Sequence, residues 1–126
     1  MTISPPARLA LQLCVALAGL VPIAGGMLGV LHPITGASAW AVNHDRYLSG
    51  LLLAIGVAFW TTIPAIEART GRFRLLTGLV AIGGLGRLVG VLSGDPLSLP
   101  VGAALGMELA VTPLLCFWQS RLGEYS

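Results

Sequence analysis

The sequence predicts an all-α integral membrane protein, a four-helix bundle with both termini in the cytoplasm. Three observations predict it. Hydrophobic residues make up 56% of the 126 residues and charged residues only 10%, the apolar residues form long segments, and arginines gather in the connections on one side. Soluble domains carry about 25% charged residues, and a small one must cover a large surface with polar groups. A lipid environment removes that requirement.

The apolar segments cover residues 9–31, 47–66, 73–92 and 99–118. Each reaches the ~20 residues that cross ~30 Å of hydrocarbon at about 1.5 Å per residue. None alternates with the period of two that marks a barrel strand, and a helix satisfies its backbone polar groups without water. We therefore expect a single transmembrane domain over residues 1–126 with these helices.

Short connections separate the segments. Residues 67–72 form a polar turn, and residues 93–96 form a second, tight turn. Ser98 can cap the fourth helix. Pro22 and Pro113 each remove a backbone hydrogen bond, so we expect bends in the first and fourth helices.

Arginine positions predict the orientation. One side is flanked by Arg8, Arg69, Arg72, Arg74 and Arg121, and the other only by Arg46. Basic residues favour the cytoplasmic side, so we expect the side with five arginines, and with it both termini, to be cytoplasmic. We expect a multi-pass protein of the bacterial inner (plasma) membrane. Residues 37–39 resemble a signal-peptide cleavage site, but a signal's apolar core spans about 7–15 residues. The longer first segment favours an uncleaved anchor.

Glycines at four-residue spacing predict where helices pack. Helices gain little from burying apolar surface in lipid, so small residues that allow close approach matter most. The spaced glycines are Gly25 and Gly29 in the first segment, Gly86, Gly90 and Gly94 in the third, and Gly102 and Gly106 in the fourth. We expect the third helix to be the most tightly packed.

Two charged residues lie inside apolar segments. Arg87 is ~8 Å and Glu108 ~12 Å from the outer ends of the third and fourth helices at 1.5 Å per residue. A central charge costs roughly 2.5–3.5 kcal/mol on insertion scales. We therefore expect them to pair or to line a polar pocket. Both a structural pair and a ligand, ion or proton site remain open.

Further polar residues gather on the same outer side. Asn43 and Arg46 open the second segment, and Asp95 lies in the outer turn. Arg46 has two possible roles: it snorkels to the interface, or it joins Arg87 and Glu108. The second arrangement would suit an anionic head group or a carboxylate.

Other function classes have little support. The net charge of +2 is too small and scattered to indicate a nucleic-acid partner. Cys14 and Cys116 have no metal-site spacing, and His32 and His44 fall at helix ends. Because we find no nucleophile–base set and no cofactor motif, we expect no catalytic residues, no metal and no cofactor.

Short motifs carry a family resemblance. The second segment opens with the residues Arg46-Tyr47-Leu48-Ser49-Gly50, Gly86-Arg87 stands in the third, and Glu108 precedes Pro113 in the fourth. Over roughly residues 8–120 the chain resembles small four-helix bacterial inner-membrane proteins catalogued as a domain of unknown function. It is more distantly similar to DoxX-like membrane proteins. Ser49 stands where the first motif usually has a glycine. The resemblance implies a four-helix bundle, marks Arg46, Arg87 and Glu108, and supplies no activity.

Three functions remain as hypotheses. The first is a small accessory or assembly subunit that packs against other membrane proteins. The second is an oligomeric binding or transport unit for a small anionic or lipid-like ligand at the Arg/Glu site. The third, a membrane enzyme acting on a lipid or quinone, has no nameable nucleophile or redox centre. The lipid bilayer is the partner common to all three.

Overall fold

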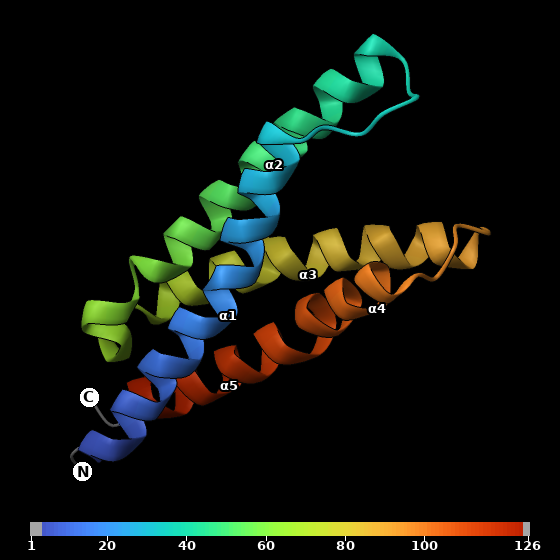
Figure 1. The fold of residues 1–126 in the computed structure, drawn as a ribbon. Coiled ribbons are helices and arrows are strands. Elements are labelled where there is room, and N and C mark those ends of the chain that lie inside the picture. Colours follow the sequence, from blue (N-terminus) through green and yellow to red (C-terminus); the bar gives the residue numbers. More distant parts are fainter. Residues whose placement is uncertain (1–3, 125–126) are drawn as a thin grey trace. The chain divides into compact units, whose positions relative to one another are not determined.

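The computed structural model describes residues 4–124, and every regular element in this range is helical (Figure 1). The elements are α1 (Pro5–Leu31), α2 (Ala39–Trp60), the 3-10 helix η1 (Ile63–Ala68), α3 (Thr70–Leu92), α4 (Leu99–Gly106), the π-helical turn η2 (Met107–Val111) and α5 (Thr112–Gly123). The predicted all-α class is therefore confirmed. The last three elements follow one another without a break and form one rod, which we call the α4–α5 rod.

Three helical stretches are long and apolar enough to cross a membrane: Pro5–Leu31, Thr70–Leu92 and Leu99–Gly123. They indicate a multi-pass membrane protein. The prediction of four such segments is met by three, because α2 does not qualify. Residues 43–46 place four polar side chains in the first half of this helix, and they lower its mean hydropathy.

The start of α2 differs from the prediction. The helix begins at Ala39 rather than Tyr47. Ser38 caps it, because its hydroxyl accepts a hydrogen bond from the backbone N–H of Ala41 at 3.2 Å. Residues 43–46 are therefore part of the helix and not of the loop that precedes it.

The end of α2 also comes earlier than predicted. The helix stops at Trp60 rather than Ile66. Pro64 has no backbone N–H to donate, and Ala65 leaves helical geometry with φ −129° and ψ 51°. The residues that the prediction added to this helix form the separate 3-10 helix η1.

The chain divides into two compact units. In the unit of residues 13–64, α1 and α2 approach closely at a glycine. A Cβ on Gly26 would lie 2.6 Å from the backbone nitrogen of Leu53 and 2.6 Å from the carbonyl oxygen of Ser49. The indole N–H of Trp60 also donates to the carbonyl of Ala16 at 3.1 Å. This unit is thus a helical hairpin. Only a residue without a Cβ at position 26 permits the close distance between α1 and α2.

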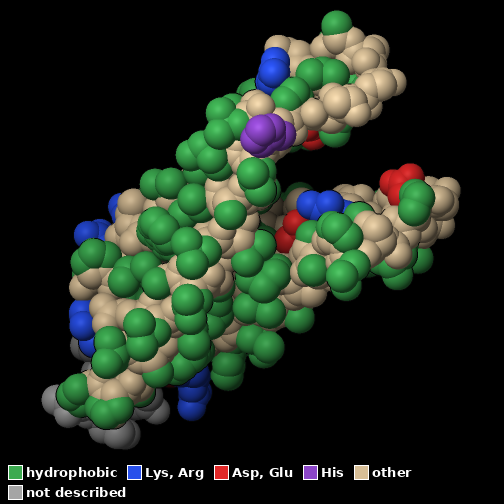
Figure 2. Space-filling view, in the orientation of Figure 1, with side chains coloured by type: hydrophobic (Ala, Val, Ile, Leu, Met, Phe, Trp, Pro, Cys, Tyr) green, Lys and Arg blue, Asp and Glu red, His purple; other side chains and the backbone are tan. Residues whose placement is uncertain are grey.

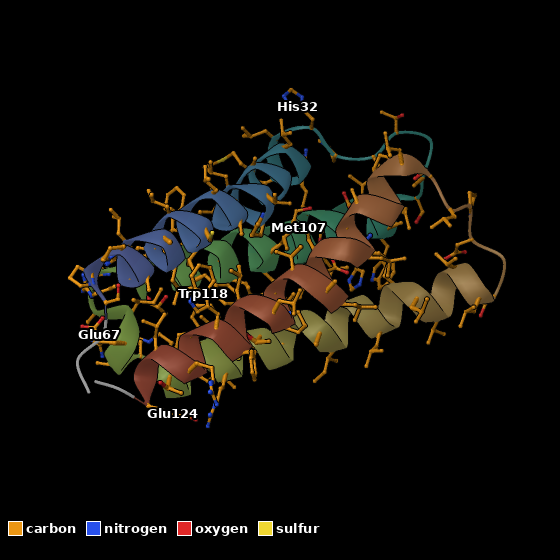
Figure 3. The ribbon with its side chains drawn as sticks, turned by 90° about the horizontal axis from the view of Figure 1, so that it is seen from below. His32, Glu67, Met107, Trp118 and Glu124 are labelled. Carbon is orange, nitrogen blue, oxygen red and sulfur yellow. The ribbon has the colours of Figure 1, made fainter. Side chains whose placement is uncertain are left out.

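In the unit of residues 4–12 and 65–124, α3 lies alongside the α4–α5 rod (Figure 3). Polar contacts hold one end. Arg8 Nε donates to Glu67 Oε2 at 2.8 Å. Nε2 of the buried Gln119 donates to the carbonyl of Ile66 at 2.7 Å and to the hydroxyl of Thr70 at 2.9 Å. These bonds join the start of α1, η1, the start of α3 and the end of α5, so both termini lie at this end.

The interior of the same unit is confined to that end. Its buried side chains larger than glycine are Leu11, Ile66, Phe73, Leu76, Thr77, Gln119 and Leu122. None of residues 85–118 is buried. We call this stretch, which includes the last part of α3 and most of the α4–α5 rod, the open half. It has no packed interior of its own.

The Gly26 contact leads to the first prediction. Gly26→Ala should lower the free energy of unfolding by about 1–3 kcal/mol, because the added methyl meets backbone atoms that cannot rotate away. Thermal unfolding in detergent measures this effect. Gly50→Ala is the matched control, since nothing lies within 4 Å of its Cβ position and alanine is the better helix former. Equal stability of the two variants would contradict the close helix contact.

The Arg8–Glu67 pair gives a pH prediction. The hydrogen bond from Arg8, with a backbone hydrogen bond, lowers the pKa of Glu67 below its ordinary 4.5, although burial acts in the opposite direction. A carboxyl with a lowered folded-state pKa stabilises the fold above its unfolded-state pKa and loses this contribution as pH falls through the folded-state pKa. Stability should therefore fall as the pH is lowered below about 4.5.

Thermal unfolding across this range checks the effect. Glu67→Gln should flatten the acid limb of the stability profile. Glu124→Gln is the control, because its carboxylate lies 3.8 Å from Arg121 in an exposed pair, which contributes little. An acid limb that persists unchanged in Glu67→Gln would show that this carboxylate is not responsible.

Candidate functional site

The structure joins the two charged residues that interrupt the apolar segments. Arg87 Nε donates to Glu108 Oε2 at 3.2 Å, and Arg87 Nη2 donates to Glu108 Oε1 at 3.1 Å. Two parallel bonds of this kind form the bidentate geometry that makes arginine–carboxylate pairs strong and directional. The pair links α3 to the π-helical turn η2.

Pro113 explains why Glu108 lies in a π-helical turn. A proline inside a helix lacks the N–H and crowds the carbonyl four residues earlier, here that of Leu109. The helix widens just before it: the N–H of Thr112 bonds to the carbonyl of Met107, five residues back. The hydroxyl of Thr112 donates to the same carbonyl at 2.7 Å. The expected irregularity at Pro113 thus takes the form of a π turn that begins at Met107 (Figure 3).

Gly84 lets η2 come close to α3. A Cβ at this buried position would lie 2.8 Å from the Cβ of Glu108 and 3.0 Å from Cδ2 of Leu109. Gly84 stands one helical turn before Arg87 on α3. The missing side chain therefore provides the space in which the carboxylate reaches the guanidinium.

The two partners differ in exposure. The side chain of Arg87 is 41% exposed and that of Glu108 is 16% exposed. Among the residues that the structure describes, the remaining N–H groups of Arg87 have no hydrogen-bond acceptor. Both residues belong to helices long enough to cross a membrane. The arrangement can hold two helices together, and it also leaves guanidinium donors that an anion could engage.

Of the other predicted polar residues, Asp95 belongs to the same compact unit as this pair, whereas Asn43 and Arg46 belong to the other unit. Asp95 follows the end of α3, where its N–H bonds to the carbonyl of Gly90 at 3.0 Å and Gly94 adopts a φ of +115°. Asn43 and Arg46 are exposed on α2, which belongs to the other compact unit. Their participation in a common site stays a prediction.

The predicted packing glycines fall into two groups. Gly25 and Gly29 face α2, through Leu52 and Ser49 respectively, and Gly90 faces the carboxylate of Asp95. Nothing in the described part of the chain lies within 4 Å of a Cβ built at Gly86, Gly94, Gly102 or Gly106. A packing role for these four stays a prediction.

Sequence reasoning did not single out Gln119, and it did not predict that three rings near the start of α2 stack on one another. Gln119 is fully buried, and its Oε1 has no hydrogen-bond partner among the described residues. Its signal was a lone amide directly after the apolar final segment. Trp40 and His44 stack with ring centroids 4.9 Å apart, and His44 and Tyr47 follow at 6.4 Å. The spacing of these three residues at one helical face was the available signal. Across residues 4–124 no set of three His, Cys, Asp or Glu side chains is placed to hold a metal.

Charge reversal tests the pair. Arg87→Glu and Glu108→Arg should each lower the yield of folded, membrane-inserted protein, because each leaves like charges in contact. We expect a cost of roughly 2.5–3.5 kcal/mol, the price of an uncompensated intramembrane charge. The double reversal should restore the yield. Size-exclusion chromatography of detergent-extracted protein measures it, and a double variant no better than the singles would exclude direct pairing.

Comparison with known families finds one match. The profile of a family described as "Domain of unknown function (DUF4345)" matches residues 10–119. No curated protein and no solved structure matches the chain. The similarity to DoxX-like proteins and the bacterial origin stay predictions. The matched range covers most of the chain and includes Arg46, Arg87 and Glu108. The chain therefore belongs to the DUF4345 family, whose domain has no assigned function.

Proposed function

We propose that this protein is a small accessory or assembly subunit that packs against other membrane proteins through its open half. The observation that carries the proposal is the exposure of an intramembrane charge. Arg87 lies in a helix that could cross a membrane, yet its side chain is 41% exposed. Lipid is an unfavourable neighbour for a guanidinium, so another polar surface is needed there.

Open glycine positions near the pair support a protein partner. Gly86 adjoins Arg87, while Gly102 and Gly106 precede Glu108 on the rod. Each leaves its Cβ position empty in the described chain. Such positions let a neighbouring helix approach closely, which is the main source of helix association in lipid. A partner helix seated on them would also cover Arg87.

The membrane and orientation belong to the same proposal. We place the protein in a bacterial inner membrane with both termini in the cytoplasm. The support is the distribution of arginines, because five flank the end that holds the termini and only Arg46 flanks the other side. The shared end of α1, η1, α3 and α5 agrees with termini on one side.

Glycine substitutions separate packing against a partner from packing within the chain. The double variant Gly86→Leu/Gly106→Leu should keep its own thermal stability but lose a stoichiometric membrane partner, because leucine fills the space left for the partner helix. Native mass spectrometry after gentle extraction from the native membrane measures this. Gly50→Leu is the matched control, because its Cβ position is equally open but lies on α2. A partner retained by the double variant, or a wild-type chain without one, would contradict the proposal.

A second candidate is an oligomeric binding or transport unit for a small anionic or lipid-like ligand. The unengaged N–H groups of Arg87 favour it. Here the wild-type particle would be a homo-oligomer with a retained anion or lipid. The Arg87→Glu/Glu108→Arg double reversal would fold but lose that ligand, since it reverses the donor and acceptor positions. Retention of the ligand by the folded double reversal would exclude this site.

A further inference from the structure

A group of arginines surrounds the end of the protein that holds both termini. It consists of Arg8, Arg69, Arg72, Arg74 and Arg121, and we call it the arginine belt. The contacts of Gln119 with Thr70 and of Arg8 with Glu67 bring these residues to one end of a single compact unit. In Figure 2, basic side chains project outward at this end.

The carboxylates at this end do not neutralise the belt. Glu67 pairs with Arg8 at 2.8 Å, and Glu124 lies 3.8 Å from Arg121 in a pair that is more than half exposed on both sides. The arginines therefore outnumber the carboxylates by three. Toward the other end of the same unit, Asp95 and Glu108 outnumber the single Arg87. The unit thus has one strongly positive end.

Two belt residues have no acidic partner among the residues that the structure describes. Arg74 Nη2 contacts the hydroxyl of Ser120 at 3.5 Å, which is a weak bond to a neutral group. Arg69 is exposed at the N-cap of α3 and makes no capping hydrogen bond with its side chain. Both guanidiniums can therefore bind an external anion without giving up an ion pair.

The position of these arginines is unfavourable without such an anion. The first turn of α3 contains no acidic residue, so no carboxylate of that turn offsets the positive end of the helix dipole near these basic side chains. Cations are disfavoured at that end of a helix. Exposed apolar side chains lie beside the belt, among them Leu9 at 56%, Leu75 at 65% and Phe117 at 65%. A phosphate joined to hydrocarbon chains would match both surfaces.

We propose that the arginine belt binds the phosphate head groups of anionic phospholipids, with Arg69 and Arg74 as the principal contacts. The acyl chains of these lipids lie against the apolar side chains next to the belt. Each basic residue near an anionic surface contributes about 1 kcal/mol, or about fivefold in binding. Removing both residues should therefore reduce the preference for anionic lipid about 25-fold.

The chain of residues 1–126 is reconstituted in mixed micelles that contain phosphatidylglycerol and phosphatidylethanolamine. The retained lipids are counted by native mass spectrometry. Wild-type protein should retain phosphatidylglycerol preferentially, and Arg69→Gln/Arg74→Gln should lose most of that preference. Single variants Arg69→Gln and Arg74→Gln are compared with Arg46→Gln, which removes the same charge from α2. Arg74→Lys keeps the charge and should keep the lipid.

Salt and phosphate complete the test on the wild-type protein, so it does not depend on the variants folding. The preference should weaken as salt rises, because screening reduces exposed charge interactions. Millimolar inorganic phosphate should not displace the lipid, whereas displacement would identify soluble phosphate as the ligand. A preference that is insensitive to salt, or equal loss in Arg46→Gln and Arg74→Gln, would overturn the proposal.

Discussion

A guanidinium and a carboxylate inside helices long and apolar enough to cross a membrane are best placed against each other, because lipid is an unfavourable neighbour for either charge. Arg87 and Glu108 are placed in this way, with two hydrogen bonds of 3.2 and 3.1 Å. The pair fixes both the depth and the rotation of α3 against the α4–α5 rod, because a bidentate contact tolerates little sliding. The open half, where nothing is buried, depends on this contact more than on apolar packing.

Two neighbouring residues, one on the rod and one on α3, make this contact possible. Pro113 forces the helix to widen into the turn that contains Glu108, and Gly84 leaves the space into which that turn fits. The opposite end of the unit is held differently, by a buried interior with Gln119 bonded to the backbone of η1. The end that holds Gln119 and η1 is therefore ordered by burial and hydrogen bonds. The open half is ordered by one ion pair. This contrast is the physical basis for expecting that the open half is completed by another molecule.

Much of the fold could be predicted from the sequence, because the length of an apolar segment is set by bilayer thickness. This is why the α1 and α3 segments and the α4–α5 rod were located. The start of α2 was missed because residues 43–46 are polar and resemble a loop, whereas the cap at Ser38 places them in the helix. The Arg87 and Glu108 positions were visible because charges in apolar runs are rare.

Other parts of the site could not be predicted. Glycine spacing indicates a face but not which neighbour that face meets. It favoured Gly86 and Gly90, while the contact with η2 falls on Gly84. Similarly, Pro113 indicates a disturbed helix, but the choice of a π turn depends on which carbonyl accepts from Thr112. The glycine contact is decided by helix rotation, which the ion pair sets and which the spacing of small residues leaves open.

The central claim is that Arg87 and Glu108 hold α3 against the α4–α5 rod by direct contact. The most direct measurement is solid-state NMR of the protein in lipid bilayers, which detects the dipolar coupling between the ¹⁵N-labelled guanidinium of Arg87 and the ¹³C-labelled carboxyl group of Glu108. Glu108→Gln serves to assign the signal. The account predicts a coupling that corresponds to hydrogen-bond distance in the wild type. A wild-type protein without this coupling would contradict it.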